Sequence, residues 1–105
     1  MISNELIDGI KKRLVDAFAP DKIILFGSHA RGTADDRSDV DILVICRFTG
    51  NRRRLMLEMD RVLDDLDCAF DILILTPEEF QRDRRIPGTI GRYAQQEGRT
   101  LYAQS

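Results

Sequence analysis

The sequence contains few of the residues that organise small metal-bound or cross-linked proteins, with one histidine and two cysteines among 105 residues. Cys46 and Cys68 have no metal-ligand spacing, which excludes a zinc site or a disulfide scaffold as the organising device. No apolar run approaches the length of a membrane span, and the charged N-terminal segment has the character of neither a signal nor a transit peptide. Sixteen basic and eighteen acidic residues nearly balance, so we expect no direct binding to nucleic acid or membrane.

What is present fits one small globular domain spanning residues 1–105, with 43% hydrophobic and 32% charged residues. The hydrophobic pattern predicts helices over 3–18 and 52–66, a short helix opening near 28, a helix beginning at 76, and a last helix over 89–97. Strands are predicted over 23–26, 39–45, 69–75 and 99–102. The order is typical of an α/β (α+β) fold in which helices flank a mixed β-sheet.

Three aspartates interrupt strands that should be apolar. Asp39 and Asp41 lie in one predicted strand, and Asp71 lies in the next. Buried carboxylates cost several kcal/mol unless they are paired or bind a metal. Asp39 alone could simply cap a turn, but residues two apart share one face of a strand. With Asp71 on a neighbouring strand, the three would form a set of hard oxygen ligands suited to Mg²⁺ and a phosphate substrate.

The turn at Gly27 and Ser28 supplies a complementary feature. Glycine lets a backbone approach a phosphate closely, and a serine can donate to that phosphate from the start of a short helix. Ten residues separate Ser28 from Asp39. If turn and acids share one site, the first two strands are antiparallel. The second and third are then parallel, and the helix over 52–66 is their crossover.

The stretch from Gly27 to Gly32, followed by Ser38-Asp39-Val40-Asp41, resembles the signature of the DNA polymerase β-like nucleotidyltransferase superfamily. The resemblance is greatest to the minimal nucleotidyltransferase (MNT) family, the antitoxins of HEPN/MNT toxin–antitoxin pairs. It covers nearly the whole chain and implies a polymerase β-like palm. It also implies an enzyme that transfers AMP from ATP to a tyrosine of a partner HEPN ribonuclease, with which it would form a hetero-oligomer.

The resemblance also implies roles for individual residues. Asp39, Asp41 and Asp71 would be catalytic and would hold two Mg²⁺ ions. Asp71 would also help to activate the attacking tyrosine. Gly27 and Ser28 would bind the β- and γ-phosphates of ATP. Arg31 is assigned to the same nucleotide site, although it could instead pair with the acidic residues 35 and 36.

Two other functions remain possible on the sequence alone. The chain could neutralise a toxin by binding and occlusion without catalysis, although occlusion places no demand on buried acids. It could also modify a small molecule, but enzymes of that kind carry an acceptor domain for which no segment is available. The sequence does not identify the donor base, the number of AMP units or the acceptor residue.

The remaining features have plainer interpretations. His29 is predicted to be a solvated helix residue. Cys46 and Cys68 are expected at opposite strand ends, about 20 Å apart at about 3.3 Å per residue, which favours reduced thiols and a cytoplasmic protein. Two groups of arginines are expected on the solvated surface or in a partner-binding patch. They are Arg52, Arg53, Arg54, Arg82, Arg84 and Arg85.

Overall fold

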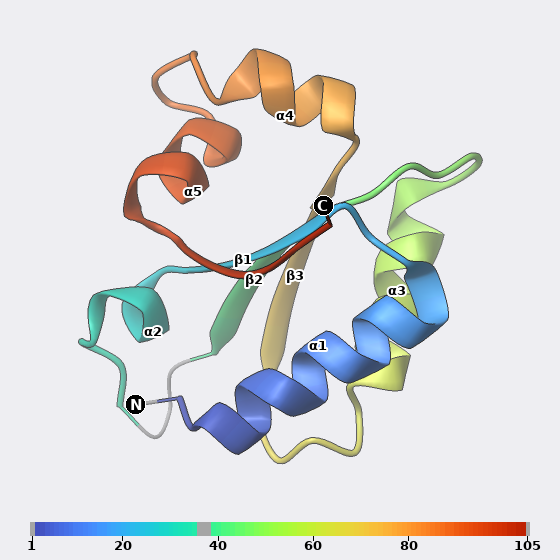
Figure 1. The fold of residues 1–105 in the computed structure, drawn as a ribbon, viewed down its shortest axis with the longest axis vertical. Helices are drawn as coiled ribbons and strands as arrows, with labels where there is room; N and C mark the ends of the chain where they lie inside the picture. The colour runs from blue at the N-terminus through green and yellow to red at the C-terminus, as the bar shows by residue number, and fades with distance from the viewer. Residues whose placement is uncertain (1, 36–38, 105) are drawn as a thin grey trace.

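A four-stranded sheet in the order β3-β2-β1-β4 forms the centre of the fold (Figure 1). The computed structural model describes residues 2–35 and 39–104. Strand β1 is antiparallel to β2 and β4, whereas β2 and β3 run parallel. The predicted mixed sheet and the directions of its first three strands are therefore confirmed. The strands are β1 (Lys22–Phe26), β2 (Val40–Ile45), β3 (Phe70–Leu75) and β4 (Arg99–Ala103).

Helices cover both faces of this sheet. In Figure 1, α1 and α3 lie on one face and α4 and α5 on the other, while α2 follows the end of β1. The expected role of α3 as the crossover between β2 and β3 is confirmed. The helices are α1 (Asn4–Phe18), α2 (Ser28–Arg31), α3 (Arg52–Val62), α4 (Pro77–Asp83) and α5 (Ile90–Glu97).

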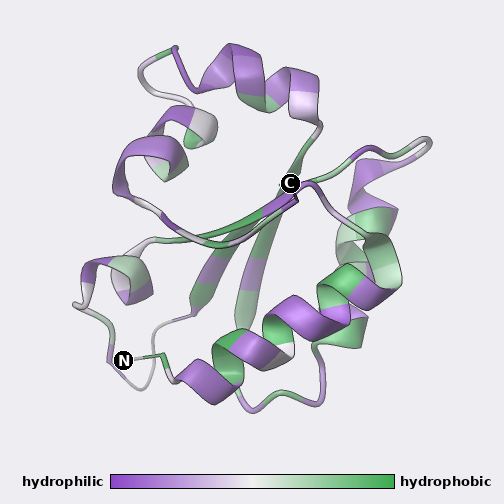
Figure 2. Ribbon diagram, in the orientation of Figure 1, coloured by the Kyte–Doolittle hydropathy of each residue, from purple (hydrophilic) through white to green (hydrophobic). Residues whose placement is uncertain are grey.

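Strand β2 separates two apolar clusters, as its nearly continuous hydrophobic sequence predicts. Val40, Ile42 and Val44 belong to the larger cluster, which includes the buried residues of α1 and Met59 of α3. Leu43 and Ile45 belong to a smaller cluster with buried residues of α4 and α5. Helix α1, which covers the larger cluster, shows alternating bands of hydrophobic and hydrophilic residues in Figure 2. The alternation along β2 decides which side chains face which layer, and so where its acids point.

Two helix starts follow the predicted capping chemistry. The Ser3 hydroxyl accepts a hydrogen bond from the Leu6 backbone N–H at 3.1 Å. At α4, the Thr76 hydroxyl accepts from the Glu79 N–H at 3.2 Å, while the Glu79 carboxylate accepts from the Thr76 N–H at 2.8 Å. This reciprocal capping box satisfies two N–H groups that a helix leaves without intrahelical partners. The chain therefore turns sharply from β3 into α4.

One helix ends several residues before its predicted boundary. Helix α3 ends at Val62 rather than at residue 66. After α3, the backbone makes tighter i to i+3 hydrogen bonds, including Leu66 N–H to the Leu63 carbonyl at 3.0 Å. These turns keep Leu63 and Leu66 against the core. The apolar spacing therefore continued beyond the helix and misplaced its end.

Both cysteines are free thiols, and burial raises the pKa of each. Cys46 follows the last residue of β2, and Cys68 precedes β3. Because β2 and β3 are parallel, the two thiols lie at opposite ends of the sheet, as predicted. In the part of the chain that the structure describes, no helix has the length and apolar character needed to cross a membrane.

Candidate active site

The three aspartates that interrupt the apolar strands meet at one end of the sheet. Asp41 lies in register with Asp71 of β3 on one side and with Phe26 of β1 on the other. Asp39 immediately precedes β2. Val40 points into the cluster beneath α1 and α3, so strand alternation turns Asp39 and Asp41 toward the opposite face. The parallel register turns Asp71 the same way. The sequence therefore predicted this juxtaposition correctly.

Asp41 is the most constrained of these acids. It is half-buried, whereas Asp39 and Asp71 are exposed. Burial, the charges of Asp71 and Asp39, and a hydrogen bond with the Asp71 side chain raise the pKa of Asp41, while the charge of His29 lowers it. The net effect is to raise this pKa, so the surroundings of Asp41 disfavour its negative charge.

Gly27 lies directly against this acid. Its φ is +73° and its ψ is −154°, a combination that is essentially restricted to glycine. A Cβ atom at this position would lie 2.2 Å from the Oδ2 atom of Asp41. The missing side chain therefore allows the turn after β1 to pack against the Asp41 carboxylate. The chain offers a glycine turn and an acid in contact, as the spacing of the two motifs suggested.

Ser28 begins α2 immediately after this glycine, so its hydroxyl and amide lie at the same end of the sheet as the acids. The Gly27 carbonyl accepts hydrogen bonds from the N–H groups of Ala30 and Arg31, both at 3.1 Å. These bonds fix the single helical turn. The placement agrees with the predicted turn and short helix.

Arg31 makes a contact that the sequence did not predict. Its Nη1 atom donates a hydrogen bond to the hydroxyl of Tyr93 in α5. The Tyr93 ring packs edge-on against Phe26, with ring centroids 6.1 Å apart. Residue 36, one of the two acids proposed as a partner for Arg31, lies outside the described residues. The apolar spacing of α5 indicated only a core-facing helix, so no signal identified Tyr93.

His29 differs from its predicted role as a solvated residue. It is half-buried, and its charge acts favourably on Asp41. The reason is tertiary, because the turn at Gly27 places the start of α2 beside the start of β2. His29 is therefore part of the electrostatic surroundings of the acids.

The donor set fits Mg²⁺. Carboxylate oxygens are the ligands that this ion prefers, and it often takes only one or two from protein when substrate phosphates supply others. Among residues 2–35 and 39–104, no three metal-ligating side chains already converge into a complete cage. Asp41 and Asp71 nevertheless lie in register on adjacent strands, and the charge of Asp71 acts on Asp41. A cation bound between them would relieve this repulsion.

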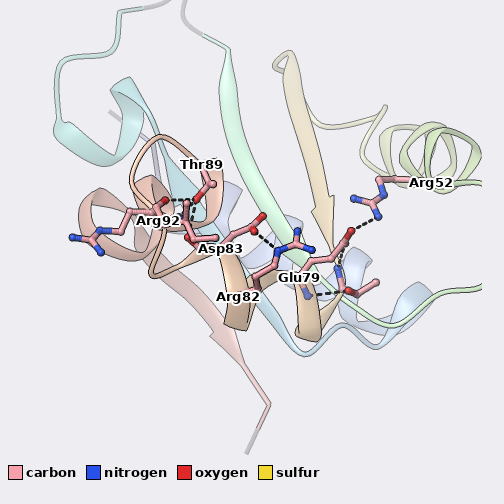
Figure 3. A network of polar contacts seen from close by, with 8 residues as sticks. Arg52, Glu79, Arg82, Asp83, Thr89 and Arg92 are labelled. Carbon is pink, nitrogen blue, oxygen red and sulfur yellow. Dashed lines mark hydrogen bonds and ion pairs between the residues drawn. The ribbon is translucent and has the colours of Figure 1, made fainter.

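Two arginines near the opposite end of β3 are exposed, as expected, and also make structural contacts. Arg52 pairs with Glu79 at 2.7 Å (Figure 3), donates to the Ile74 carbonyl at 3.2 Å, and lies over the Phe48 ring. The Arg82 Nε atom pairs with Asp83 at 2.7 Å. Arg52 is exposed, as expected, and it also links α3 to the start of α4 because Glu79 approaches it in the folded chain.

A family model for the nucleotidyltransferase domain matches residues 7–104. The chain is 41% identical over 69 residues to a protein of Methanocaldococcus jannaschii named "Putative protein adenylyltransferase MJ1305". That match covers 64% of this chain and 45% of the relative, so the chain spans about half the length of the curated protein that it matches.

Two solved structures share the fold. One is a toxin–antitoxin crystal structure with AMP-PNP, with a TM-score of 0.71, 24% identity, and coverage of 94% of this chain and 74% of the other. The second contains a tri-AMPylated HEPN toxin of Shewanella oneidensis in complex with an MNT antitoxin. Its TM-score is 0.67, with 22% identity and coverage of 98% and 74%. At these identities the likeness establishes the fold alone.

Proposed function

Because the chain belongs to the nucleotidyltransferase domain family, as its glycine–serine and aspartate motifs predict, we propose that it transfers AMP from ATP to a protein. The observation that carries this proposal is the contact between the Gly27 turn and the Asp41 carboxylate, with Asp71 in register beside it. This arrangement offers a turn for phosphates next to ligands for their counter-ion. The curated adenylyltransferase relative supports adenine as the base of the donor nucleotide.

We propose a HEPN toxin as the partner and a tyrosine hydroxyl on it as the acceptor. The shared fold with an MNT antitoxin bound to an AMPylated HEPN toxin supports this choice. In this role the chain is the antitoxin, and it inactivates the toxin by modification. The two free thiols are consistent with a reducing compartment, so we place the reaction in the cytoplasm.

The proposed reaction breaks a phosphoanhydride bond of ATP and forms a phosphodiester link between AMP and the tyrosine oxygen. The tyrosine oxygen attacks the α-phosphorus of ATP, the bond from that phosphorus to the bridging oxygen breaks, and pyrophosphate leaves. Asp71 accepts the proton of the hydroxyl. Asp39, Asp41 and Asp71 would hold two Mg²⁺ ions, which supply charge neutralisation for the phosphates.

The remaining residues of the site bind and orient the nucleotide. Gly27 and Ser28 would contact the β- and γ-phosphates, because the turn leaves room for close approach beside Asp41. Arg31 would meet the triphosphate from the same short helix. Its hydrogen bond to Tyr93 restricts where its guanidinium can lie. Arg31 is thus assigned to nucleotide binding, and the Tyr93 hydroxyl orients its guanidinium.

Intact-mass spectrometry tests the proposal directly. The full chain is mixed with the HEPN-family protein encoded beside its gene, together with ATP and Mg²⁺. We expect the partner to gain one or more adenylyl groups, and peptide mapping to locate them on tyrosine. With Asp39→Asn or Asp41→Asn we expect transfer to fall on the order of 10³-fold or more, because each lost metal ligand removes several kcal/mol of transition-state stabilisation.

The same mixture distinguishes catalysis from occlusion. A stable complex with no mass gain on either protein, in the wild type as in the aspartate variants, would contradict the transferase. It would favour an antitoxin that neutralises by binding. Transfer that persists in Asp41→Asn would instead contradict the assignment of the site.

A further inference from the structure

An apolar groove runs along the outer edge of β3. One part has a volume of about 500 Å³ and is lined mainly by apolar side chains of β3 and its neighbours, including Met56, Ile72, Leu73 and Ile90. A second part, of about 190 Å³, is lined by Leu57, Phe70 and Asp71 among others. Met56 and Ile72 line both parts, so the two adjoin one another along β3. The groove therefore leads along β3 to an acid of the candidate active site.

The backbone of β3 is available along part of this edge. Strand β3 is terminal in the sheet, with β2 as its neighbour. The carbonyls of Ala69 and Leu75 accept hydrogen bonds from residues of the β2 chain, at 2.9 and 3.0 Å. Alternation then turns the carbonyls of Phe70, Ile72 and Ile74 outward. An exposed strand edge of this kind is a template for pairing with another chain.

Arg52 limits where such pairing can occur. Its Nη1 atom donates to the Ile74 carbonyl at 3.2 Å, and its Nη2 atom is held by Glu79 at 2.7 Å. The guanidinium thus covers the end of β3 that lies far from the acids. The open part of the edge is the part from Phe70 to Ile72, which flanks Asp71. A chain that pairs with β3 is therefore directed toward the candidate active site.

The side chains along the groove favour a protein segment as the occupant. Leu57 of α3 is 51% exposed, although it is large and apolar, and it lies next to Asp71 in the groove lining. An apolar lining beside a free strand edge suits an extended peptide, whose backbone pairs with the strand while its side chains fill the apolar positions. A triphosphate, in contrast, needs the polar turn at Gly27.

We propose that the groove along β3 is the docking site of the acceptor protein, which lays an extended apolar segment beside Phe70–Ile72. The hydroxyl to be modified then reaches Asp71 from the edge of the sheet. This inference rests on the proposed transfer of AMP to a protein and says where that protein binds. It divides the site into two approaches, with the nucleotide arriving over Gly27 and the acceptor arriving along β3.

A matched pair of surface variants tests the docking site. Leu57 and Ile86 are the exposed large hydrophobic residues of the described chain, at 51% and 44%, and Ile86 is not among the groove residues. With Leu57→Asp we expect the KM for the acceptor protein to rise about tenfold, since docking would bury an unpaired carboxylate against apolar side chains. The KM for ATP and the Tm should stay at wild-type values. Ile86→Asp should leave all three unchanged.

Photo-crosslinking provides a second readout that does not depend on rate. A photoreactive residue at position 57 should capture the acceptor protein, and one at position 86 should not. Equal acceptor KM values and equal crosslinking for the two positions would overturn the docking site. So would a Leu57→Asp variant that loses self-association but keeps its acceptor KM, because the groove would then hold a second copy of this chain.

These results separate the two proposals. If the wild-type chain transfers no AMP to the partner, the proposed function fails. If the wild type transfers AMP and Leu57→Asp transfers it with an unchanged acceptor KM, the function stands and the docking site fails.

Discussion

The two ends of β2 and β3 handle charge in opposite ways. Where the strands begin, Asp41 and Asp71 lie side by side and share a hydrogen bond, with Asp39 close by. Where the strands end, acids meet bases. Arg47 pairs with Glu78 at 3.1 Å and Arg52 with Glu79 at 2.7 Å, on segments that follow the same two strands.

The contrast separates the part of the molecule that stabilises the fold from the part that performs chemistry. Opposite charges at one end lower the pKa of Glu79, chiefly through the hydrogen bond from Arg52. At the other end, burial and then the like charges of Asp71 and Asp39 raise the pKa of Asp41. A fold tolerates the second arrangement when a bound cation or substrate makes use of it. Changes at the two ends should therefore affect stability and activity differently.

Among substitutions outside the three aspartates, the largest effect on transfer is expected from Gly27→Ala. The new Cβ would collide with the Asp41 carboxylate, and alanine would have to adopt a backbone conformation that is essentially restricted to glycine. We expect transfer to fall about 10²-fold, because displacing a catalytic group by about 1 Å has an effect of that size. The free energy of unfolding should fall by about 1–3 kcal/mol. Transfer assays and denaturant unfolding measure the two effects.

Gly50→Ala is the control for backbone strain. Gly50 also has a positive φ, of +90°, but a Cβ there would meet nothing within 4 Å. We expect a loss of about 1 kcal/mol in stability and transfer within a few-fold of wild type. If both variants lose transfer equally, the contact between Gly27 and Asp41 is not what the reaction requires.

A smaller and opposite effect on stability is expected from Asp41→Asn. The neutral amide avoids the cost of burying a carboxylate, and then the repulsion from Asp71 and Asp39, which together raise the pKa of Asp41, so the free protein should gain about 1 kcal/mol at neutral pH. Thermal melts should show a Tm about 4–8 °C higher. The pKa of Asp41 is higher in the folded state than in the unfolded state. The free energy of unfolding of the wild type therefore falls as the pH rises through the raised pKa.

The pH dependence supplies the control for this variant. Well below the ordinary pKa of 3.8, Asp41 is protonated in both states, and the advantage of Asn should vanish. Added Mg²⁺ and ATP should stabilise the wild type and leave the variant unchanged. A variant that is less stable than wild type at neutral pH would contradict the electrostatic account of this end of the sheet.

The smallest effect is expected from Glu79→Gln at the opposite end. The salt bridge with Arg52 is partly exposed, so its loss should cost less than about 1 kcal/mol. Because the pKa of Glu79 is lowered in the folded state, its contribution is present above about pH 4.5 and is lost as the pH falls through the lowered value. Urea unfolding at pH 7 and pH 3 should show the difference only at pH 7. A loss of transfer in this variant would break the division between the two ends.

Much of the candidate site could be predicted because its parts are local in sequence. The spacing of Asp39 and Asp41 places both on one face of a strand, and the glycine–serine turn precedes a short helix. The pairing of Asp71 with Asp41 followed from the strand order and from the long crossover that parallel strands need. Helix α3 was placed correctly at its start and wrongly at its end, because the apolar repeat continues into the turns around Leu63 and Leu66.

The sequence by itself determined the strands, their directions and the end of the sheet at which the acids gather, since alternation and connection length act locally. Only the tertiary structure decided which distant groups surround them. Tyr93 supports Arg31 across 62 positions, His29 faces Asp41, and Arg52 reaches both Glu79 and the edge of β3. Such contacts depend on how helices pack on the two faces of the sheet, and no periodic pattern records which side chains then meet.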